Sequence, residues 1–278
     1  MVSAFNMQMT QHCYTTLPHM IYKNVQKKVN MDMDNLFHYS QESNLALNST
    51  KTKWMLLSTK QMSSKQDLES ISLNIKCSGK SIQRVSSTKL LGVHINQHLT
   101  WEDHITNTLS SCYGTLSVLR KIKNFAPLLI RKHIVESLVL SKLDYCNAVY
   151  GNIPDYQLKR LQRLQNSCAG YVLAKFAKTD DLERLGWLSI KKRLELSIAK
   201  LSHKSLYEQI PLKTKQHIVT EYNLRSLNAP KLEKASKLEK GTFQDQSSTV
   251  FNNLPSDLRN CTEHSLFCKN MKTYMFKL

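Results

Sequence analysis

Glycine and proline are scarce in this sequence, which has seven glycines and six prolines among 278 residues. Such numbers exclude a collagen-like chain, argue against a disordered one and favour long regular elements, helices above all. No stretch approaches 18 consecutive apolar residues, so we expect no transmembrane helix. The first 20 residues lack a basic segment followed by an apolar one, so we expect no signal peptide. We therefore expect an intracellular protein, in the nucleus or the cytoplasm, that is not secreted and has no membrane partner.

Cysteine is also sparse, and its pattern excludes a disulfide framework. The seven cysteines are an odd number and are widely scattered, which favours a reducing compartment. Cys261, His264 and Cys268 have a spacing that resembles part of a zinc site, but no fourth cysteine or histidine follows them. We therefore expect no metal ligands. Phosphate-binding loops, nucleophile elbows and metalloprotease helices are missing from the sequence, so a hydrolase is not supported.

Acidic residues are outnumbered nearly two to one by basic ones. The chain has 39 lysines and arginines against 21 acidic residues, a net charge of +18. Between Arg120 and Lys215 alone, 19 basic residues stand against 8 acidic ones. Such a surplus favours a polyanionic partner, because each cation near a phosphate releases condensed counterions. The alternative is a basic protein that binds no nucleic acid, and charge alone does not decide between them.

Hydrophobic patterning predicts an α+β fold in two main parts. Residues 21–99 combine a helix over 23–43 with strands over 53–58, 71–77 and 90–95, and with a polar loop over 59–70. Residues 100–211 form a basic, mainly helical part, with helix starts at Thr100, Pro127 and Pro154 and a further helix beyond Trp187 that ends at Pro211. We expect residues 1–20 to be poorly ordered. Residues 212–278 are predicted to be a linker and a partly extended tail with one short terminal element.

Six segments of the chain form an ordered series. They are LALNSTKTKWML (45–56), TKLLGVHI with LTWEDHI (88–105), KLDYCNAVYG (142–151), LQRLQN (161–166), LERLGWLSIKKR (182–193) and FNNLPSDLR (251–259). The series resembles the C-terminal part of the reverse transcriptases of LINE-type (non-LTR) retrotransposons, in particular their jockey-like branch. The resemblance covers about residues 13–278. It implies the edge of a polymerase palm with its primer-grip hairpin over 21–99, followed by a thumb-like domain over 100–211.

The resemblance also indicates which chemistry is missing. Members of this family are RNA-directed DNA polymerases that hold two Mg²⁺ ions with aspartates, in part from a Tyr-x-Asp-Asp hairpin. The matching stretch here is CYTTLPH (13–19), which has no carboxylate. The family's other aspartate would lie upstream of Met1, so we expect this chain to lack it as well. We therefore expect a truncated, catalytically inactive remnant without catalytic residues. We expect no cofactor, because Mg²⁺ would be expected only for an intact family member. The activity that we expect to remain is, at most, binding to the backbone of an RNA or DNA primer–template.

The resemblance places candidate nucleic-acid contacts in the palm-edge part. Lys51 stands where the family has a lysine that neutralises the departing pyrophosphate. Leu91, Gly92 and Val93 stand in the primer grip, where Gly92 would let the backbone approach the sugar-phosphate chain of the primer. The alternatives are a solvated lysine after a turn and an ordinary turn or bulge glycine.

Basic residues on two predicted helices are the other candidates. They are Lys159, Arg160, Arg163, Lys191, Lys192 and Arg193. Lys159 and Arg163 are one helical turn apart and could follow a phosphate chain, while Gln162 and Gln165 could donate to sugars or bases. The alternative for this row is the solvated back of an amphipathic helix.

Three further observations belong to the thumb-like part. Gly170 and Tyr171 stand where the family has a basic residue, which weakens the expected contact there. Trp101 and Trp187 lie among apolar neighbours, so we interpret them as core anchors in preference to base-stacking residues. The alternative function is a domesticated helical module that binds another protein through its apolar faces, and a decayed element without function is the third interpretation.

Overall fold

The structure, a computed structural model, describes residues 19–68, 70–207, 218–219, 229–236 and 241–277. The chain divides into two compact units, residues 1–99 and residues 100–278. The division falls where hydrophobic patterning also placed a boundary. Helices dominate and the strands form small two-stranded sheets, which confirms the α+β, mainly helical class. No helix in the described ranges is long and apolar enough to cross a membrane. The segment predicted to be poorly ordered and the stretch matched to the polymerase hairpin lie, but for their last one or two residues, outside the described residues.

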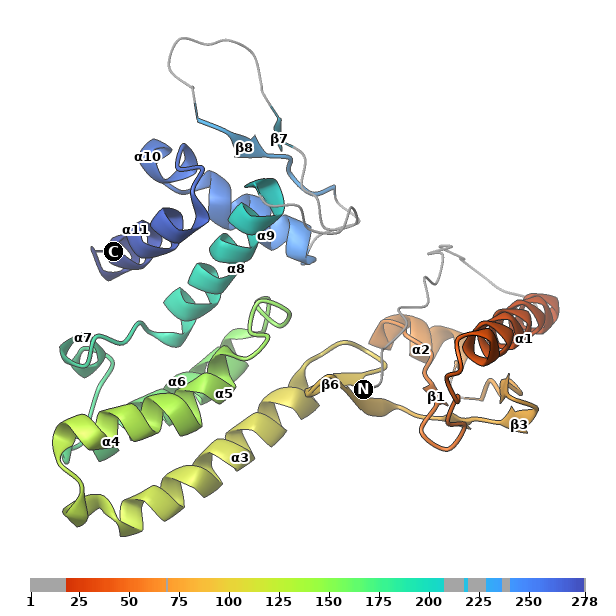
Figure 1. The fold of residues 1–278 in the computed structure, drawn as a ribbon, viewed down its shortest axis with the longest axis horizontal. Coiled ribbons are helices and arrows are strands. Elements are labelled where there is room, and N and C mark those ends of the chain that lie inside the picture. Colours follow the sequence, from red (N-terminus) through yellow and green to blue (C-terminus); the bar gives the residue numbers. More distant parts are fainter. Residues whose placement is uncertain (1–18, 69, 208–217, 220–228, 237–240, 278) are drawn as a thin grey trace. The chain divides into compact units, whose positions relative to one another are not determined.

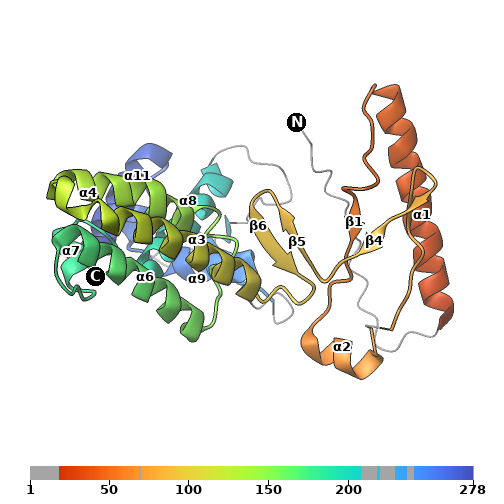
Figure 2. The same ribbon diagram turned by 90° about the horizontal axis from the view of Figure 1, so that it is seen from below.

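Unit 1 holds one long helix and a set of short strands (Figure 1). Its elements are α1 (His19–Glu42), β1 (Lys53–Trp54), α2 (Lys60–Gln66), β2 (Lys76–Cys77), β3 (Lys80–Ser81), β4 (Gln83–Arg84), β5 (Ser87–Leu90) and β6 (Val93–Asn96). β1 pairs with β4 in parallel, whereas β2–β3 and β5–β6 are antiparallel. Helix α1 lies along the strands (Figure 2) and packs Met33 against Ile75 and Ile82. The Asn30 side chain also accepts a hydrogen bond from the Lys76 N–H at 2.9 Å, which fixes α1 to β2.

Three expectations for unit 1 are wrong in detail. The predicted polar loop over 59–70 contains α2, which starts where the Thr59 hydroxyl accepts a hydrogen bond from the Met62 N–H. The strands predicted over 53–58 and 71–77 form ladder pairs only at β1 and β2. The strand predicted over 90–95 is broken by a turn at Leu91 and Gly92, whose φ angles are 46° and 87°. Positive φ angles at two successive residues are typical of a two-residue hairpin turn. Leu91 and Gly92 therefore form the tip of the β5–β6 hairpin.

The first layer of unit 2 is built from helices on both sides of α6. Its elements are α3 (Glu102–Lys121), the 3₁₀ turn η1 (Lys123–Phe125), α4 (Leu128–Val135), the π-helical turn η2 (Glu136–Leu140), α5 (Ser141–Asp144), α6 (Asp155–Leu173) and α7 (Asp181–Arg184). Pro127 and Pro154 directly precede α4 and α6, where the missing N–H of proline costs nothing. The core between these helices contains Leu116, Val139 and Leu164.

The start of α3 differs from the prediction. Thr100 is not the N-cap; the helix follows Trp101, whose φ is 58° and whose side chain makes no capping hydrogen bond. The Trp101 carbonyl accepts the first helical hydrogen bond, from the Ile105 N–H at 2.9 Å. Trp101 also packs against the core, as predicted for this tryptophan. The contacts of this half-buried indole ring with the core offset the cost of the left-handed backbone, and no local motif reveals that balance.

The second layer of unit 2 packs on α8. Its elements are α8 (Ile190–Tyr207), β7 (Ile218–Val219), β8 (Lys231–Leu232), α9 (Phe243–Asn252), α10 (Ser256–Arg259) and α11 (His264–Lys277). Phe251 of α9 and Phe267 and Met271 of α11 are buried in one cluster with Leu196 of α8. The described residues 241–277 are therefore a helical part of unit 2, whereas the sequence predicted a tail with one short element. Residues 208–217, 220–228 and 237–240 of the predicted linker lie outside the described residues.

Gly151 lies where α8 and α9 approach the turn after α5. A Cβ atom at this position would lie 2.5 Å from Gln246 Oε1 and 2.8 Å from Ile198 Cδ1. Both distances are shorter than van der Waals contact, and Ile198 is buried. A larger residue at 151 must therefore displace side chains of the second layer.

We expect Gly151→Ala to lower the free energy of unfolding by about 1 kcal/mol, because overpacking outweighs the entropy gained by losing a glycine. Gly114→Ala is the matched control, since a Cβ atom there meets nothing within 4 Å on the exposed face of α3. That control should stabilise the protein by about 0.5–1 kcal/mol. Urea unfolding followed by circular dichroism measures both values, and equal stability of the two variants would contradict the packing account.

Candidate nucleic-acid interface

Lys51 lies in an exposed turn of unit 1. The Asn48 side-chain oxygen accepts hydrogen bonds from the N–H groups of Thr50 and Lys51 at 3.0 and 3.2 Å, which closes the turn. The Lys51 side chain is exposed. This geometry matches the alternative that the sequence left open, a solvated lysine after a turn.

The primer-grip candidates do not share one surface. Leu91 is 70% exposed at the tip of the β5–β6 hairpin, and Gly92 completes the turn beside it. Val93 is buried inside unit 1, so its side chain is not available to a primer. Of the three, only Leu91 and Gly92 lie at the hairpin turn, whereas Val93 begins strand β6, so the primer-grip interpretation stays a prediction for the turn alone.

The basic residues of α6 also differ from one another in exposure. Lys159 and Arg163 are exposed one turn apart, as the helical spacing predicted. Arg160 is half-buried and donates a hydrogen bond to the Thr106 hydroxyl of α3 at 3.2 Å. Lys159 and Arg163 therefore remain candidates for phosphate contact, while Arg160 also joins two helices.

The two glutamines of α6 hold the segment that enters α8. Gln165 is fully buried, and its amide donates to the Leu188 carbonyl at 2.8 Å. Gln162 Oε1 accepts a hydrogen bond from the Ile190 N–H at 3.0 Å. The Gln162 Nε2 group donates to Gln165 Oε1 and Asn166 Oδ1 at 3.0 and 2.9 Å. Both amide groups are therefore engaged within the protein, which disfavours the interpretation that they donate to sugars or bases.

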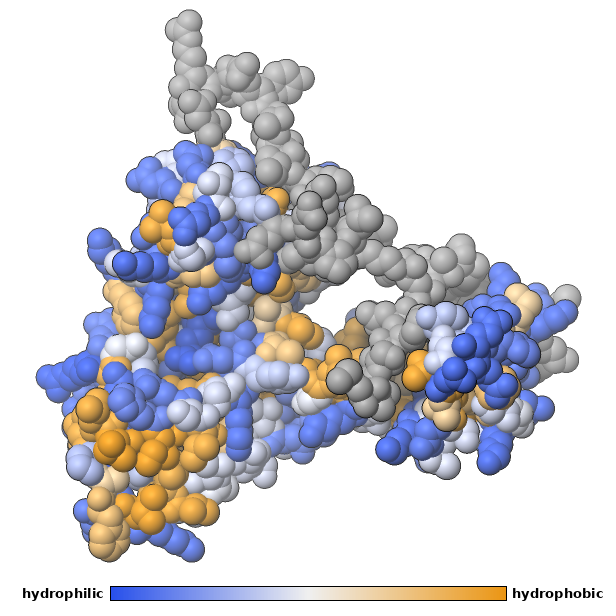
Figure 3. Space-filling model, in the orientation of Figure 1, coloured by the Kyte–Doolittle hydropathy of each residue, from blue (hydrophilic) through white to orange (hydrophobic). Residues whose placement is uncertain are grey.

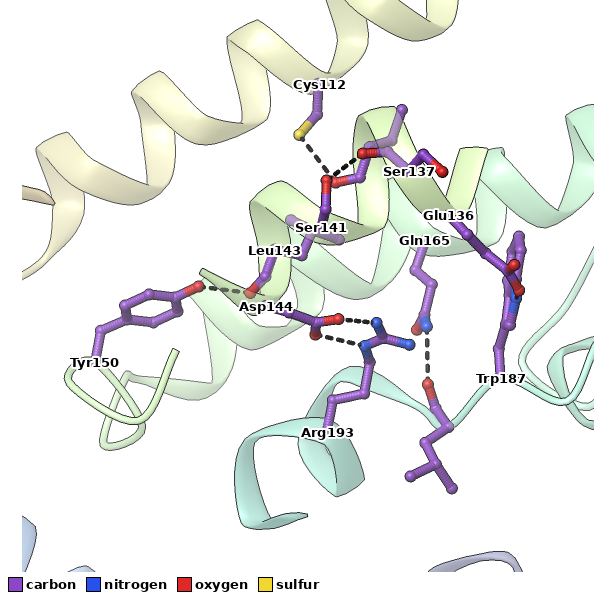
Figure 4. A network of polar contacts seen from close by, with 12 residues as sticks. Cys112, Glu136, Ser137, Ser141, Leu143, Asp144, Tyr150, Gln165, Trp187 and Arg193 are labelled. Atoms are coloured by element: carbon purple, nitrogen blue, oxygen red, sulfur yellow. Dashed lines mark hydrogen bonds and ion pairs between the residues drawn. The ribbon is translucent and has the colours of Figure 1, made fainter. Parts of the chain in front are cut away.

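The basic residues at the start of α8 differ in exposure and in their partners. Arg193 Nε donates to Asp144 Oδ1 at 2.9 Å, and its Nη2 pairs with the other carboxylate oxygen (Figure 4). The same view shows Trp187, which is buried and donates to Glu136 Oε1 at 2.7 Å. The guanidinium of Arg193 is held by an acidic partner, which favours the structural alternative over a phosphate contact. Lys191 is exposed and Lys192 is half-buried.

Three further motif residues of unit 2, Gly186, Asn252 and Arg259, also stabilise the protein's own backbone. Gly186, with φ of 67°, ends α7 in a left-handed cap, in which the Trp187 N–H donates to the Leu182 carbonyl at 2.9 Å. The Asn252 amide exchanges two hydrogen bonds, of 2.8 and 2.9 Å, with the backbone of Leu232. The buried Arg259 donates to carbonyls at 254, 229 and 230. The motif residues from 142 onward therefore serve largely to hold the backbone of unit 2 in place.

A cavity of about 700 Å³ brings basic residues of different segments together. Its lining includes Arg120 and Lys123 from the end of α3 and from η1, Arg163 from α6, and Lys175 and Phe176 from the following loop. The sequence did not single out Arg120, Lys123, Lys175 or Phe176 as candidates. The three cations among them lie near the ends of predicted helices, but only the packing of α3 on α6 places them around one cavity.

The loop after α6 brings a cation beside Gly170 and Tyr171, the two positions at which this chain has no basic residue. A Cβ atom at Gly170 would lie 3.0 Å from the Lys175 carbonyl oxygen, so the chain folds back tightly over the end of α6. This fold places Lys175 at the cavity beside Gly170 and Tyr171. The Lys175 ammonium also pairs with Asp181 at 2.5 Å, and this hydrogen bond holds the pKa of the Asp181 carboxyl below its ordinary value. The cation at this end of α6 is therefore Lys175, from further along the chain, and the weakened contact expected at Gly170 and Tyr171 stays a prediction.

The Cys261–His264–Cys268 spacing gains a fourth residue in space, His203 of α8. The atoms do not converge, however, because Cys268 Sγ and His203 Nδ1 contact opposite nitrogens of His264. Cys261 Sγ instead lies 3.4 Å from the Glu263 carbonyl. Among the described residues no group of three or more such side chains is placed to hold a metal ion.

Comparisons with models of known families, with curated proteins and with solved structures found no match.

We expect Arg193→Gln to lower the free energy of unfolding by about 1 kcal/mol, because it removes a two-point ion pair whose arginine is mostly buried. Lys191→Gln, on the exposed face of the same helix, is the control and should change it by less than about 0.5 kcal/mol. Chemical unfolding measures both. In an Asp144→Asn background the Arg193→Gln loss should shrink, and a loss of unchanged size would show that the pair does not act as a unit.

Proposed function

We propose that this chain is a remnant of a LINE-type reverse transcriptase whose helical unit binds nucleic-acid backbone and which does not polymerise DNA by itself. The observation that carries the binding proposal is the basic cavity lined by Arg120, Lys123, Arg163 and Lys175. The proposal of family origin rests on the ordered series of sequence motifs alone.

The charges at this cavity are available to an anion. Within the part of the chain that the structure describes, Arg120, Lys123 and Arg163 form no ion pair. Phe176 is 89% exposed at the same cavity and offers an aromatic face on which a base could stack. Phosphates and bases alternate along a nucleic-acid strand, so cations beside an exposed aromatic ring suit this ligand better than a simple anion.

A fluorescently labelled RNA–DNA primer–template measures the binding by anisotropy. If three phosphates are neutralised, affinity should fall roughly 40-fold between 50 and 200 mM salt. The triple variant Arg120→Gln, Lys123→Gln, Arg163→Gln should bind more weakly and with a shallower salt slope, because those counterions are no longer released.

The matched control is Lys234→Gln, Lys269→Gln, Lys272→Gln, which removes the same charge from exposed positions elsewhere in unit 2. It should retain most of the affinity. An equal loss in both triple variants would mean that net charge alone attracts the nucleic acid. No binding at 50 mM salt would overturn the proposal.

Primer extension tests the proposed lack of polymerisation. The full chain, with a primer–template, nucleotides and Mg²⁺ or Mn²⁺, should incorporate no more than a protein-free control, because no carboxylate stands at 13–19 to hold the metals. Templated incorporation above that control would contradict the proposed inactivity while leaving the binding result intact.

An exposed apolar surface favours the second candidate, a module that binds another protein. Figure 3 shows hydrophobic residues gathered over α4 and the end of α3. The exposed large hydrophobics of this stretch include Phe125, Leu128, Leu129 and Ile130. Surfaces of this kind mark protein interfaces. Sedimentation velocity separates the two candidates, since a defined oligomer that Leu129→Gln dissociates would support this function, whereas a monomer without salt-sensitive nucleic-acid binding would support neither.

A further inference from the structure

Helices α8 and α11 bring a cysteine and two histidines into one hydrogen-bonded chain. Cys268 Sγ lies 3.4 Å from Nε2 of His264, one turn earlier on α11. His264 Nδ1 lies 3.2 Å from Nδ1 of His203 on α8. His203 Nε2 lies 2.7 Å from the Cys261 carbonyl oxygen. The chain therefore runs from a thiol through two imidazoles to a backbone acceptor.

The backbone acceptor determines where each proton lies in the neutral chain. A carbonyl oxygen only accepts, so His203 Nε2 carries a proton and its Nδ1 is an acceptor. His264 must then donate from Nδ1 to His203, which leaves His264 Nε2 as an acceptor. That nitrogen faces the Cys268 thiol, so the thiol donates its proton to an imidazole base.

The same chain accommodates the ionised pair without rearrangement. When the proton moves from Cys268 to His264 Nε2, the resulting imidazolium donates from both nitrogens, to the thiolate and to His203. Its Nδ1–H already points at His203 Nδ1, so that hydrogen bond is kept. This is the arrangement of a nucleophile, a base and a third group that orients the base.

His203 is held in place by packing. It is completely buried, its ring stacks on Phe267 with centroids 4.2 Å apart, and Tyr207 lies at 4.7 Å. Cys268 and His264 are half-buried, so a small reagent can reach the sulfur. The buried cysteines of the first layer differ, since burial raises the pKa of Cys112 to about 11 and that of Cys168 to about 12.

We propose that Cys268 is a nucleophilic thiol and a site of oxidation by hydroperoxides, with His264 as its base and His203 as a positioning residue. The Cys268 thiolate attacks the terminal oxygen of the hydroperoxide, so that an S–O bond forms and the O–O bond breaks. The His264 imidazolium gives its Nε2 proton to the departing oxygen, which leaves as water or an alcohol. Sulfur is oxidised by two electrons to a sulfenic acid, the peroxide is reduced by two, and His264 returns to the neutral form.

Iodoacetamide alkylation of the folded full chain at pH 7, followed by peptide mass spectrometry, tests the thiol directly. Cys146 is the internal reference, because it is exposed in the same unit. Cys268 should react about tenfold faster than Cys146, since an ordinary cysteine is only a few per cent thiolate at this pH. A Cys268 rate equal to or below that of Cys146 would overturn the proposal.

Variants of the two histidines separate the roles. His264→Gln should bring the Cys268 rate down to that of Cys146, whereas His133→Gln, at an exposed position of α4, should leave it unchanged. His203→Asn keeps an acceptor for His264 Nδ1–H and should retain most of the rate, whereas His203→Leu should lose it. The Cys268-to-Cys146 ratio is measured in each folded variant, so a merely structural role for His203 would leave the ratio unchanged and contradict its positioning role.

One equivalent of hydrogen peroxide followed by dimedone tests the oxidation step. The dimedone adduct should form on Cys268 in the native chain and fall about tenfold in His264→Gln, in proportion to the thiolate fraction. Fast alkylation without an adduct would overturn the peroxide reaction, and an adduct formed equally on Cys146 would overturn its selectivity.

Discussion

Two glutamine side chains on one face of α6 hold the chain that enters α8, and the arrangement of unit 2 depends on them. Gln165 is fully buried and donates to the Leu188 carbonyl, while Gln162 accepts from the Ile190 N–H. A buried amide that loses its partner costs about 1–3 kcal/mol, so α8 cannot shift along α6 without stranding one of these groups. The start of α8 in turn places Arg193 beside Asp144 and turns the apolar face of α8 toward α9 and α11.

Other motif residues of unit 2 also stabilise the protein's own backbone. Asn252 and Arg259 satisfy backbone groups at 229–232, and Gly186 lets α7 end in a compact cap. Side chains of this kind hold a backbone in place, so a resemblance that rests on them points to a shared frame more than to shared ligand contacts. The proposed nucleic-acid binding rests instead on cations that the frame leaves exposed around the basic cavity.

The two proposals use different residues of unit 2. Binding depends on long flexible cations at the end of α3, in η1 and along α6, whose placement is approximate and whose attraction is screened by salt. Thiol activation depends on a short hydrogen-bonded chain between α8 and α11, in which the buried His203 ring accepts from His264. Loss of surface charge and loss of an imidazole should therefore affect separate properties.

Apolar periodicity, proline positions and the charge surplus are local or additive properties, and they were enough to predict the mainly helical α+β class, the long helices α1, α3, α6 and α8, and the basic character of residues 120–215. They failed at α2, where a hydroxyl cap outweighs the polar composition, and at the start of α3, where a half-buried indole packs against the core. They also could not distinguish Arg193 from Lys191. Periodicity tells which face of a helix is apolar, but not which polar residue will lie opposite it. His203 and His264 are 61 positions apart, and Arg120 and Lys175 lie on different segments. Only the packing of helices brings such pairs together.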